Sequence, residues 1–310
     1  MDRLQRIGFD LIGGYMSEKT VIRQKRFDDE RSLFGQQDLF LENVIFEKGE
    51  SPLKEAKNLT IVQGEFKYKY PLWYAENVDV KDSIWFEMAR SGVWYTDHIR
   101  VENSTIVAPK NFRRCRDITL RNVTFTDAQE TLWSCRDINM EQVTAKGPYF
   151  AMNSEDLVID GLTLDGNYPF DGARNITIKN SRLISKDAFW NTENVLVENC
   201  YIYGEYLGWN SKNLTFRNCT IESTQGLCYI QNLKMENCRL VNTQLAFEYC
   251  DVDAQITGKV DSVLNPTSGR IQADAIGELI ISPDLIDPSK TKIICSSIDE
   301  KRSEINWDEI

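Results

Sequence analysis

The sequence predicts an all-β protein, a parallel β-helix of about 12 to 14 coils with a cap at each end. The main observation is a repeat of 19 or 20 residues that runs through most of the 310-residue chain. Each repeat opens with an Asn or Asp anchor, followed by apolar, variable, apolar, polar and Asn-like positions. A fixed period this short is typical of a solenoid. The anchors are Asp38, Asn58, Asn77, Asp97, Asp117, Asp137, Asp156, Asn175, Asn194, Asn213, Asn232 and Asp251.

Alternation within each repeat predicts strands. In the repeat that begins at Asn194, Val195 and Val197 are expected to point inward on either side of Leu196, which is expected to point outward. A period of two residues is typical of β-strands, and the apolar residues are mostly β-branched or aromatic, as strands prefer. Each repeat holds two clear strands and a short third one before the next anchor, which is the arrangement of a parallel β-helix.

A second polar column supports this interpretation, because an amide-rich position returns about five residues after most anchors. Side-chain amides stacked one strand spacing apart can hydrogen-bond along the solenoid while they close a bend. We therefore assign the column a structural role. Its members are Asn43, Asp82, Asn103, Asn122, Gln142, Asn180, Asn199, Asn218 and Asn237.

The repeated phrase from Asp38 to about Ile281, the amide column and the ending Asn265 to Ile271 resemble the pectin-lyase-like right-handed parallel β-helix proteins. The chain is most similar to a bacterial domain-of-unknown-function family with short, regular coils. This resemblance implies a right-handed helix and says nothing about a reaction. A pentapeptide-repeat helix, with 20-residue coils and a five-residue sub-period, is the alternative. The alternation and the 19-residue gaps argue against it.

The organisation follows from the limits of the repeat. Residues 1–37 are expected to form an N-terminal cap with the first strands, and residues 38–282 the β-helix. Residues 283–310 are expected to form a C-terminal cap or tail. Caps are needed because a terminal coil otherwise exposes its core and its strand edges.

Composition and charge limit the classes of partner that the protein is expected to bind. The formal net charge of −11 argues against nucleic acid, which needs a cationic surface. The chain has no apolar stretch long enough to span a membrane and no apolar leader at its N-terminus, so we expect a cytoplasmic protein without a membrane partner. The sequence does not indicate an oligomeric state.

Five of the eight cysteines recur at matching positions of the repeat: Cys200, Cys219 and Cys238 share one place, and Cys115 and Cys135 share another. We interpret them as a ladder of buried thiols, since a free cysteine packs as a small hydrophobe. Stacked neighbours would also lie near the distance for a disulfide. The single histidine, His98, is expected to be a buried or turn residue. No zinc-ligand spacing is present, so we expect neither a metal nor a cofactor.

Tryptophan marks the third strand. The position four residues before each anchor is expected to face outward, while the position before it is apolar or small and is expected to face inward. Trp94 and Tyr95 add aromatic rings beside Val93. The outward column contains Trp73, Val93, Arg113, Trp133, Met152, Asp171, Trp190, Trp209, Cys228 and Phe247.

An outward row of indole rings suits sugar rings, whose apolar faces stack on aromatic side chains. The sequence therefore suggests carbohydrate recognition, with an oligosaccharide as partner. The same row would also suit packing within the fold or a protein contact, so a non-catalytic scaffold that binds a protein is the alternative. The proposed sugar-binding residues are Trp73, Trp94, Trp133, Trp190 and Trp209.

Whether the protein is an enzyme is left open by the sequence. A glycoside hydrolase, lyase or epimerase on this fold would need paired carboxylates or an arginine, and the candidates are Arg113, Asp165 and Asp171. Asp165 also belongs to the alternating series Asp127, Lys146, Asp165, Lys186, Glu205, which a surface salt ladder explains without chemistry. The short period leaves few residues for the walls of a catalytic groove.

Overall fold

The protein is a parallel β-solenoid with a period of about 19 residues, as the sequence predicts, and its turns number about 15, slightly more than the 12 to 14 expected. A computed structural model describes residues 19–304. The chain divides into two compact units, Met1–Phe150 (unit 1) and Ala151–Ile310 (unit 2). Over the described residues, the structure contains no helix long and apolar enough to cross a membrane.

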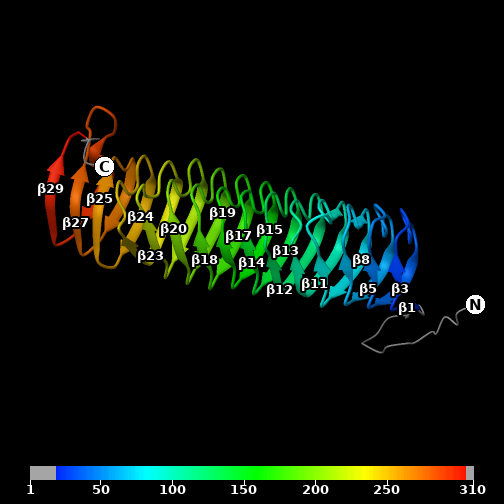
Figure 1. Cartoon of the computed structure of the whole chain (residues 1–310). Coiled ribbons are helices and arrows are strands. Elements are labelled where there is room, and N and C mark those ends of the chain that lie inside the picture. The colour runs from blue at the N-terminus through cyan, green and yellow to red at the C-terminus, as the bar shows by residue number, and fades with distance from the viewer. Residues whose placement is uncertain (1–18, 305–310) are drawn as a thin grey trace, which may run out of the picture. The chain divides into compact units, whose positions relative to one another are not determined.

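Unit 1 is built from parallel strands that pair with their counterparts one turn away, so that β3, β5 and β8 lie side by side (Figure 1). Its strands are β1 (Thr20–Arg23), β2 (Arg26–Phe27), β3 (Gln37–Glu42), β4 (Ile45–Phe46), β5 (Lys57–Val62), β6 (Glu65–Phe66), β7 (Leu72–Trp73), β8 (Glu76–Lys81), β9 (Ile84–Trp85), β10 (Val93–Trp94), β11 (Asp97–Ile106), β12 (Arg116–Phe125), β13 (Arg136–Glu141) and β14 (Thr144–Lys146).

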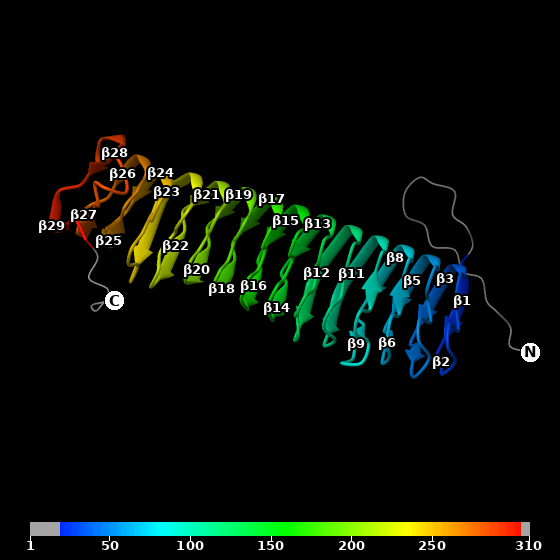
Figure 2. The same cartoon turned by 90° about the horizontal axis from the view of Figure 1, so that it is seen from above.

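Unit 2 repeats this pattern, and Figure 2 shows β17, β19 and β21 in succession. A short 3-10 helix, η1 (Pro288–Lys290), is its one helical element among the described residues. Its strands are β15 (Glu155–Asp160), β16 (Thr163–Asp165), β17 (Arg174–Lys179), β18 (Arg182–Ile184), β19 (Glu193–Glu198), β20 (Tyr201–Gly204), β21 (Lys212–Arg217), β22 (Thr220–Ser223), β23 (Gln231–Val241), β24 (Asp251–Ile256), β25 (Lys259–Leu264), β26 (Ser268–Gln272), β27 (Ala275–Ile280), β28 (Thr291–Ile294) and β29 (Ser297–Arg302).

Parallel pairing reaches both ends of the described chain. β1 pairs with β3, so residues before the first anchor already belong to the solenoid. β28 pairs with β26 and β29 pairs with β27, so strands continue into the segment 283–310 that we expected to be a cap or tail. β29 carries Asp299, Glu300 and Lys301 on an edge, and charged edges discourage pairing with other chains.

Register places like residues above like residues in the core. Val195 pairs with Leu214 and Val197 pairs with Phe216, and all four are buried, as the alternation predicts. Leu196 is half-buried rather than exposed, because Thr177 and Thr215 flank it in register on the neighbouring strands. In unit 1 the same register stacks the rings of Phe27, Phe46, Phe66 and Trp85, whose centroids lie 5.1, 5.3 and 4.5 Å apart in turn.

Ten of the twelve anchors are corner residues with a left-handed backbone, and Asp97 and Asp251 are not. Asn194, for example, has a φ of 59°, and Asn and Asp tolerate this conformation better than most residues. In the fourth repeat the corner residue is His98, with a φ of 57°, and not Asp97. Register confirms this, because Asp97 pairs with Glu76 and Arg116, the residues before the neighbouring anchors. A histidine at this corner does not fit the Asn or Asp pattern of the other repeats, whereas Asp97 beside it does.

The amide columns form directional ladders. In unit 2 the side-chain N–H of Asn232 donates to Asn213, which donates to Asn194, then Asn175, and finally Asp156, over distances of 2.8 to 3.0 Å. Each amide thus donates to the turn before it. The last residue of the ladder only has to accept a hydrogen bond, and Asp156, whose carboxylate has no N–H to donate, fills this place. A second ladder runs from Asn237 through Asn218, Asn199 and Asn180 and ends on Asp160.

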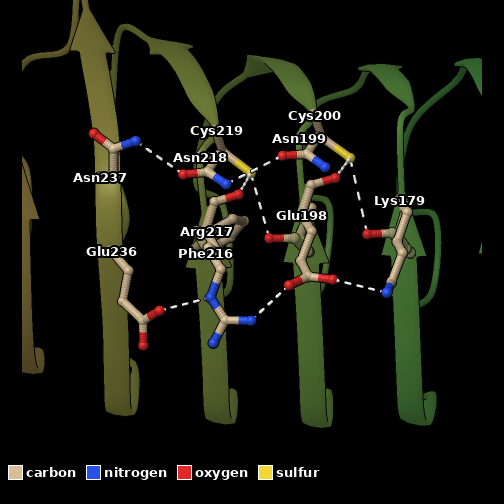
Figure 3. Close-up of polar contacts among 12 residues, drawn as sticks. Lys179, Glu198, Asn199, Cys200, Phe216, Arg217, Asn218, Cys219, Glu236 and Asn237 are labelled. Carbon is tan, nitrogen blue, oxygen red and sulfur yellow. Dashed lines mark hydrogen bonds and ion pairs between the residues drawn. The ribbon is translucent and has the colours of Figure 1, made fainter.

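Outward charges also alternate in register. Figure 3 shows Lys179, Glu198, Arg217 and Glu236 on four successive turns, with nitrogen–oxygen distances of 3.0, 2.5 and 2.6 Å. Hydrogen bonds from Lys179 and Arg217 lower the pKa of the Glu198 carboxyl. Each exposed ion pair contributes little to stability. If a strand paired with the turn after its correct neighbour, however, like charges would lie opposite each other, so the alternation favours the correct register.

The cysteines are free, and seven of the eight are buried. Their thiols contact backbone carbonyls of the neighbouring turn, as Cys219 does with Val197 at 3.4 Å. Burial raises the pKa of Cys228 to about 12, so this thiol stays protonated at neutral pH. The structure agrees with a ladder of packed thiols and contains no disulfide among the described residues. Cys295, on the last turn, is the more exposed one.

Truncating a stacked core ring should destabilise the fold. We expect Phe216→Ala to lower the free energy of unfolding by about 3–5 kcal/mol, because Phe216 is fully buried between Val197 and Met235. Tyr203→Ala removes an exposed ring in the same unit and should cost under about 1 kcal/mol. Urea unfolding followed by fluorescence measures both. Equal losses would contradict the inward assignment.

Ladder direction gives a second test. Asn194→Asp removes the N–H that donates to Asn175 and sets two acceptors against each other, so we expect a loss of about 1 kcal/mol at pH 7. Acidification should relieve this loss, because a protonated carboxyl can donate again. Asp156→Asn, at the accepting end of the ladder, should be nearly neutral. Denaturant unfolding of both variants at pH 7 and below pH 4 measures this. If the two variants lost the same stability at both pH values, the direction of the ladder would have no effect on stability.

Candidate functional site

Four residues form an outward column in unit 1, which we call the unit 1 strip: Trp73, Trp94, Arg113 and Trp133. β7 and β10 pair Trp73 with Trp94, and isolated bridges continue the register to Arg113 and Trp133. Val93, which we expected to face outward, is buried, and Trp94 takes its place. The outward position lies four residues before the corner residue of each turn. Because the corner is His98, 21 residues after Asn77, and not Asp97, this position is Trp94 and not Val93.

The rings of the unit 1 strip cover one another. Trp73 and Trp94 lie 5.1 Å apart with an angle of 5° between their planes. Their indole N–H groups donate to the backbone carbonyls of Ser91 and Lys110 on the following turn, at 2.6 and 3.0 Å. Faces and N–H groups are therefore engaged within the fold, and mainly ring edges remain for a ligand.

Arg113 fills the gap between two indoles. Its guanidinium carbon lies 4.7 Å from the ring centroids of both Trp94 and Trp133, which is a cation–π sandwich. Glu130 accepts from Arg113 at 2.9 Å and also pairs with Lys110 at 3.2 Å. The catalytic candidate Arg113 is thus held by packing and by an ion pair. Glu130 was not singled out from the sequence.

A second outward surface borders the strip, and we call it the tyrosine column: Tyr74, Tyr95 and Arg114, which follow Glu55 in register, together with Lys54, which shares the register of Trp73. The rings of Tyr74 and Tyr95 stack at 4.8 Å with 3° between their planes. The Lys54 ammonium lies 5.6 Å from the Tyr74 ring and the Arg114 guanidinium 5.8 Å from the Tyr95 ring. Tyr74 is 47% exposed, so this column, unlike the indole faces, is open to solvent.

Unit 2 carries its own outward aromatic column, the unit 2 strip: Trp190, Trp209, Tyr229 and Tyr249. The successive ring centroids lie 5.7, 4.3 and 5.3 Å apart, with planes inclined by 33°, 33° and 41°. The rings are thus splayed rather than stacked flat. Cys228 and Phe247, which we expected in this outward column, are buried, because the aromatic ring stands one residue later at Tyr229 and two residues later at Tyr249.

An amide column runs beside the unit 2 strip. Asn210 donates to Asn191 and Asn191 donates to Asp171, both at 2.8 Å. The catalytic candidate Asp171 is therefore the accepting end of a third ladder. Asn210 is exposed, and its side-chain oxygen has no donor among the described residues. This leaves a hydrogen-bond acceptor beside Trp209.

Two carboxyls of unit 2 near these rings were missed by the sequence reasoning. Burial raises the pKa of Asp187, and likewise the pKa of Glu248, which accepts from Gln225 at 3.3 Å and from the Tyr229 hydroxyl at 3.4 Å. Neither position repeats in neighbouring turns. A sequence signal existed only for Asp187, which stands where Tyr168 and Tyr206 stand in adjacent turns.

The remaining candidate carboxylate, Asp165, lies exposed at the end of β16. Farther along its series, Lys186 and Glu205 form an ion pair at 2.8 Å, in agreement with a salt ladder there. His98 is an exposed corner residue, which agrees with the expected turn histidine and not with a buried one, and its Nδ1 lies 2.6 Å from a carboxylate oxygen of Asp117. Within residues 19–304, no group of three or more His, Cys, Asp or Glu residues is arranged to hold a metal ion.

These features define a parallel β-helix protein with outward aromatic columns and short, regular turns. The chain belongs to the family described as "Protein of unknown function (DUF3737)", whose model matches residues 20–294. A comparison with curated proteins gave no match.

Comparison with solved structures returns other parallel β-helix proteins. PfbA, a surface adhesin of Streptococcus pneumoniae, has a TM-score of 0.39 at 8% identity, with 91% of this chain and 82% of that chain covered. The A-module of the mannuronan C-5 epimerase AlgE4 of Azotobacter vinelandii has a TM-score of 0.28 at 10% identity, with 93% and 88% covered. A mutant tailspike protein of E. coli bacteriophage HK620, in complex with pentasaccharide, has a TM-score of 0.31 at 9% identity, with 91% of this chain and 72% of that chain covered. At these values the likeness concerns the fold alone.

Because the unit 1 indoles are packed into the fold, their removal should cost stability. We expect Trp94→Ala to lower the free energy of unfolding by about 2–4 kcal/mol, since it removes a stacked, half-buried ring and one hydrogen bond. Tyr74→Ala, at an exposed ring of the neighbouring column, should cost under about 1 kcal/mol. Thermal unfolding of both variants tests this. If the Trp94 variant were as stable as the parent protein, the ring would not be packed into the fold and would be free to contact a ligand.

Proposed function

We propose that the protein recognises a neutral oligosaccharide through the unit 2 strip. The supporting observation is the splay of Trp190 and Trp209, whose planes are inclined by 33°, next to the exposed amide of Asn210. Sugar sites combine aromatic surface with a few placed polar groups. Here the rings supply the apolar surface, and Asn210, Gln225 and the tyrosine hydroxyls supply neutral hydrogen-bonding groups.

Unit 2 is favoured over unit 1 for a geometric reason. In unit 1 the indole faces are covered by parallel neighbours and by Arg113, so a sugar could reach only their edges. In unit 2 the ring planes are inclined by 33° to each other rather than parallel, although the Trp190 N–H, like those of unit 1, donates to a backbone carbonyl, that of Tyr206. Of the five tryptophans proposed from the sequence, Trp190 and Trp209 remain candidates for sugar contact, and Trp73, Trp94 and Trp133 are better explained by packing.

The proposal is one of recognition rather than catalysis. Carboxylates that would serve as acid and base are largely engaged: Asp171 ends an amide ladder, and Glu205 pairs with Lys186. Glu248 also accepts hydrogen bonds, from Gln225 and Tyr229, but burial raises the pKa of its carboxyl, as an acid catalyst would require. If a bound glycan were cleaved, Glu248 would be the first residue to change. A cytoplasmic location stays part of the proposal, supported by the free cysteines.

A glycan array followed by calorimetry tests the proposal. Tyr206 is 38% exposed and its ring lies 6.4 Å from that of Trp209, so its removal should weaken binding without unfolding the protein. We expect Tyr206→Ser to lower affinity about tenfold, which corresponds to about 1.4 kcal/mol. The matched control is Tyr203→Ser, which removes a ring that is 46% exposed on β20. Absence of any bound neutral glycan, or equal losses in the two variants, would refute the proposal.

A further inference from the structure

The tyrosine column of unit 1 is a second exposed aromatic surface, and the carbohydrate proposal does not use it. Lys54, Tyr74, Tyr95 and Arg114 follow one another on four successive turns, with a cation over each outer ring face of the tyrosine pair. Arg114 also donates to the Tyr95 hydroxyl at 3.4 Å. These contacts hold the four side chains in fixed positions before any ligand arrives.

Charge around this column is reversed relative to the whole protein. The tyrosine column, the unit 1 strip and their corner residues carry the cations Lys54, Lys110, Arg113 and Arg114. The carboxylates beside them are Glu55, 3.8 Å from Lys54, and Glu130, which Lys110 and Arg113 share. Arg114 is exposed and has no carboxylate partner among the described residues. A protein of net charge −11 thus presents a local cationic, aromatic surface.

We propose that this surface binds an acidic, extended segment of another protein. Tyrosine, tryptophan and arginine are the residues that dominate the energy of protein interfaces. Their stacking here removes most of the entropy cost of ordering them on binding. The excess of cations selects a negatively charged partner and disfavours a second copy of this acidic chain. The site lies in unit 1 and does not depend on the sugar proposal for unit 2.

The spacing of the two outer cations defines the partner further. Lys54 and Arg114 are separated by three strand spacings, or about 14 Å. An extended chain rises about 3.4 Å per residue, so carboxylates four residues apart would match this distance. The expected motif is an extended segment with acidic residues at positions i and i+4 and an apolar or aromatic residue between them, against Tyr74 and Tyr95.

Binding of a synthetic peptide tests the inference. The probe is a fluorescent twelve-residue peptide with glutamates at i and i+4, and its partner probe has glutamine at both places. We expect the glutamate peptide to bind the full-length protein, more weakly at high salt, and the glutamine peptide to bind at least about tenfold more weakly. Fluorescence anisotropy measures both. Equal affinities would overturn the role of charge.

Matched variants locate the site. The double change Lys54→Gln and Arg114→Gln should weaken binding of the glutamate peptide about tenfold or more. Lys234→Gln with Arg239→Gln removes the same charge from exposed positions on β23 of unit 2 and should leave affinity within about twofold. Equal losses would show non-specific attraction and overturn the site.

Polygalacturonate, added as a competitor, separates a peptide from an anionic glycan. We expect polygalacturonate to displace the peptide only when its carboxylates are in large excess over those of the peptide. It is overturned if the polymer binds this face more tightly than the peptide does. Tyr206→Ser should leave peptide binding unchanged, so failure of this site and failure of the sugar proposal remain distinguishable.

Discussion

In-register stacking of turns is the constraint on which the rest of this structure depends. Each residue has its own counterpart one strand spacing above and below, about 4.8 Å away. Side chains that can pair with themselves therefore recur: the Asn ladder from Asn232 to Asp156, the rings from Phe27 to Trp85, and the column of cysteines. Charged side chains cannot pair with themselves, so they alternate in sign instead, as Glu198 does between Lys179 and Arg217.

The same constraint limits function. Stacking covers ring faces, and ladders engage carboxylates that could otherwise act as acids or bases, as Asp171 and Glu130 show. Sites are therefore expected where the repeat is interrupted. The inclined rings around Trp209, the half-buried Glu248 and Arg114, which has no carboxylate partner among the described residues, are such interruptions. The interruption in unit 1 carries a cation beside stacked tyrosines, and those in unit 2 carry inclined rings and a half-buried carboxyl.

Regular turns also place bulky residues in a backbone conformation that most residues avoid. Phe189 is fully buried and has a φ of 65°, close to the left-handed region that suits Asn and Gly. Burial of its ring, stacked at 5.6 Å on Phe170, compensates for a strain of about 1 kcal/mol. Neither propensity nor alternation predicts such a corner, because the favourable contact comes from the next turn.

The sequence by itself determined the solenoid, its period, the inward and outward residues of the main strands, and the amide ladder, because these features repeat and each repeat confirms the others. Tertiary structure alone decided the corner at His98, the outward position of Trp94, and the fate of the tryptophans. The spacing along the chain shows that a ring points outward. Only the neighbouring turn decides whether its face is covered, since that depends on the angle between two rings and on an arginine such as Arg113.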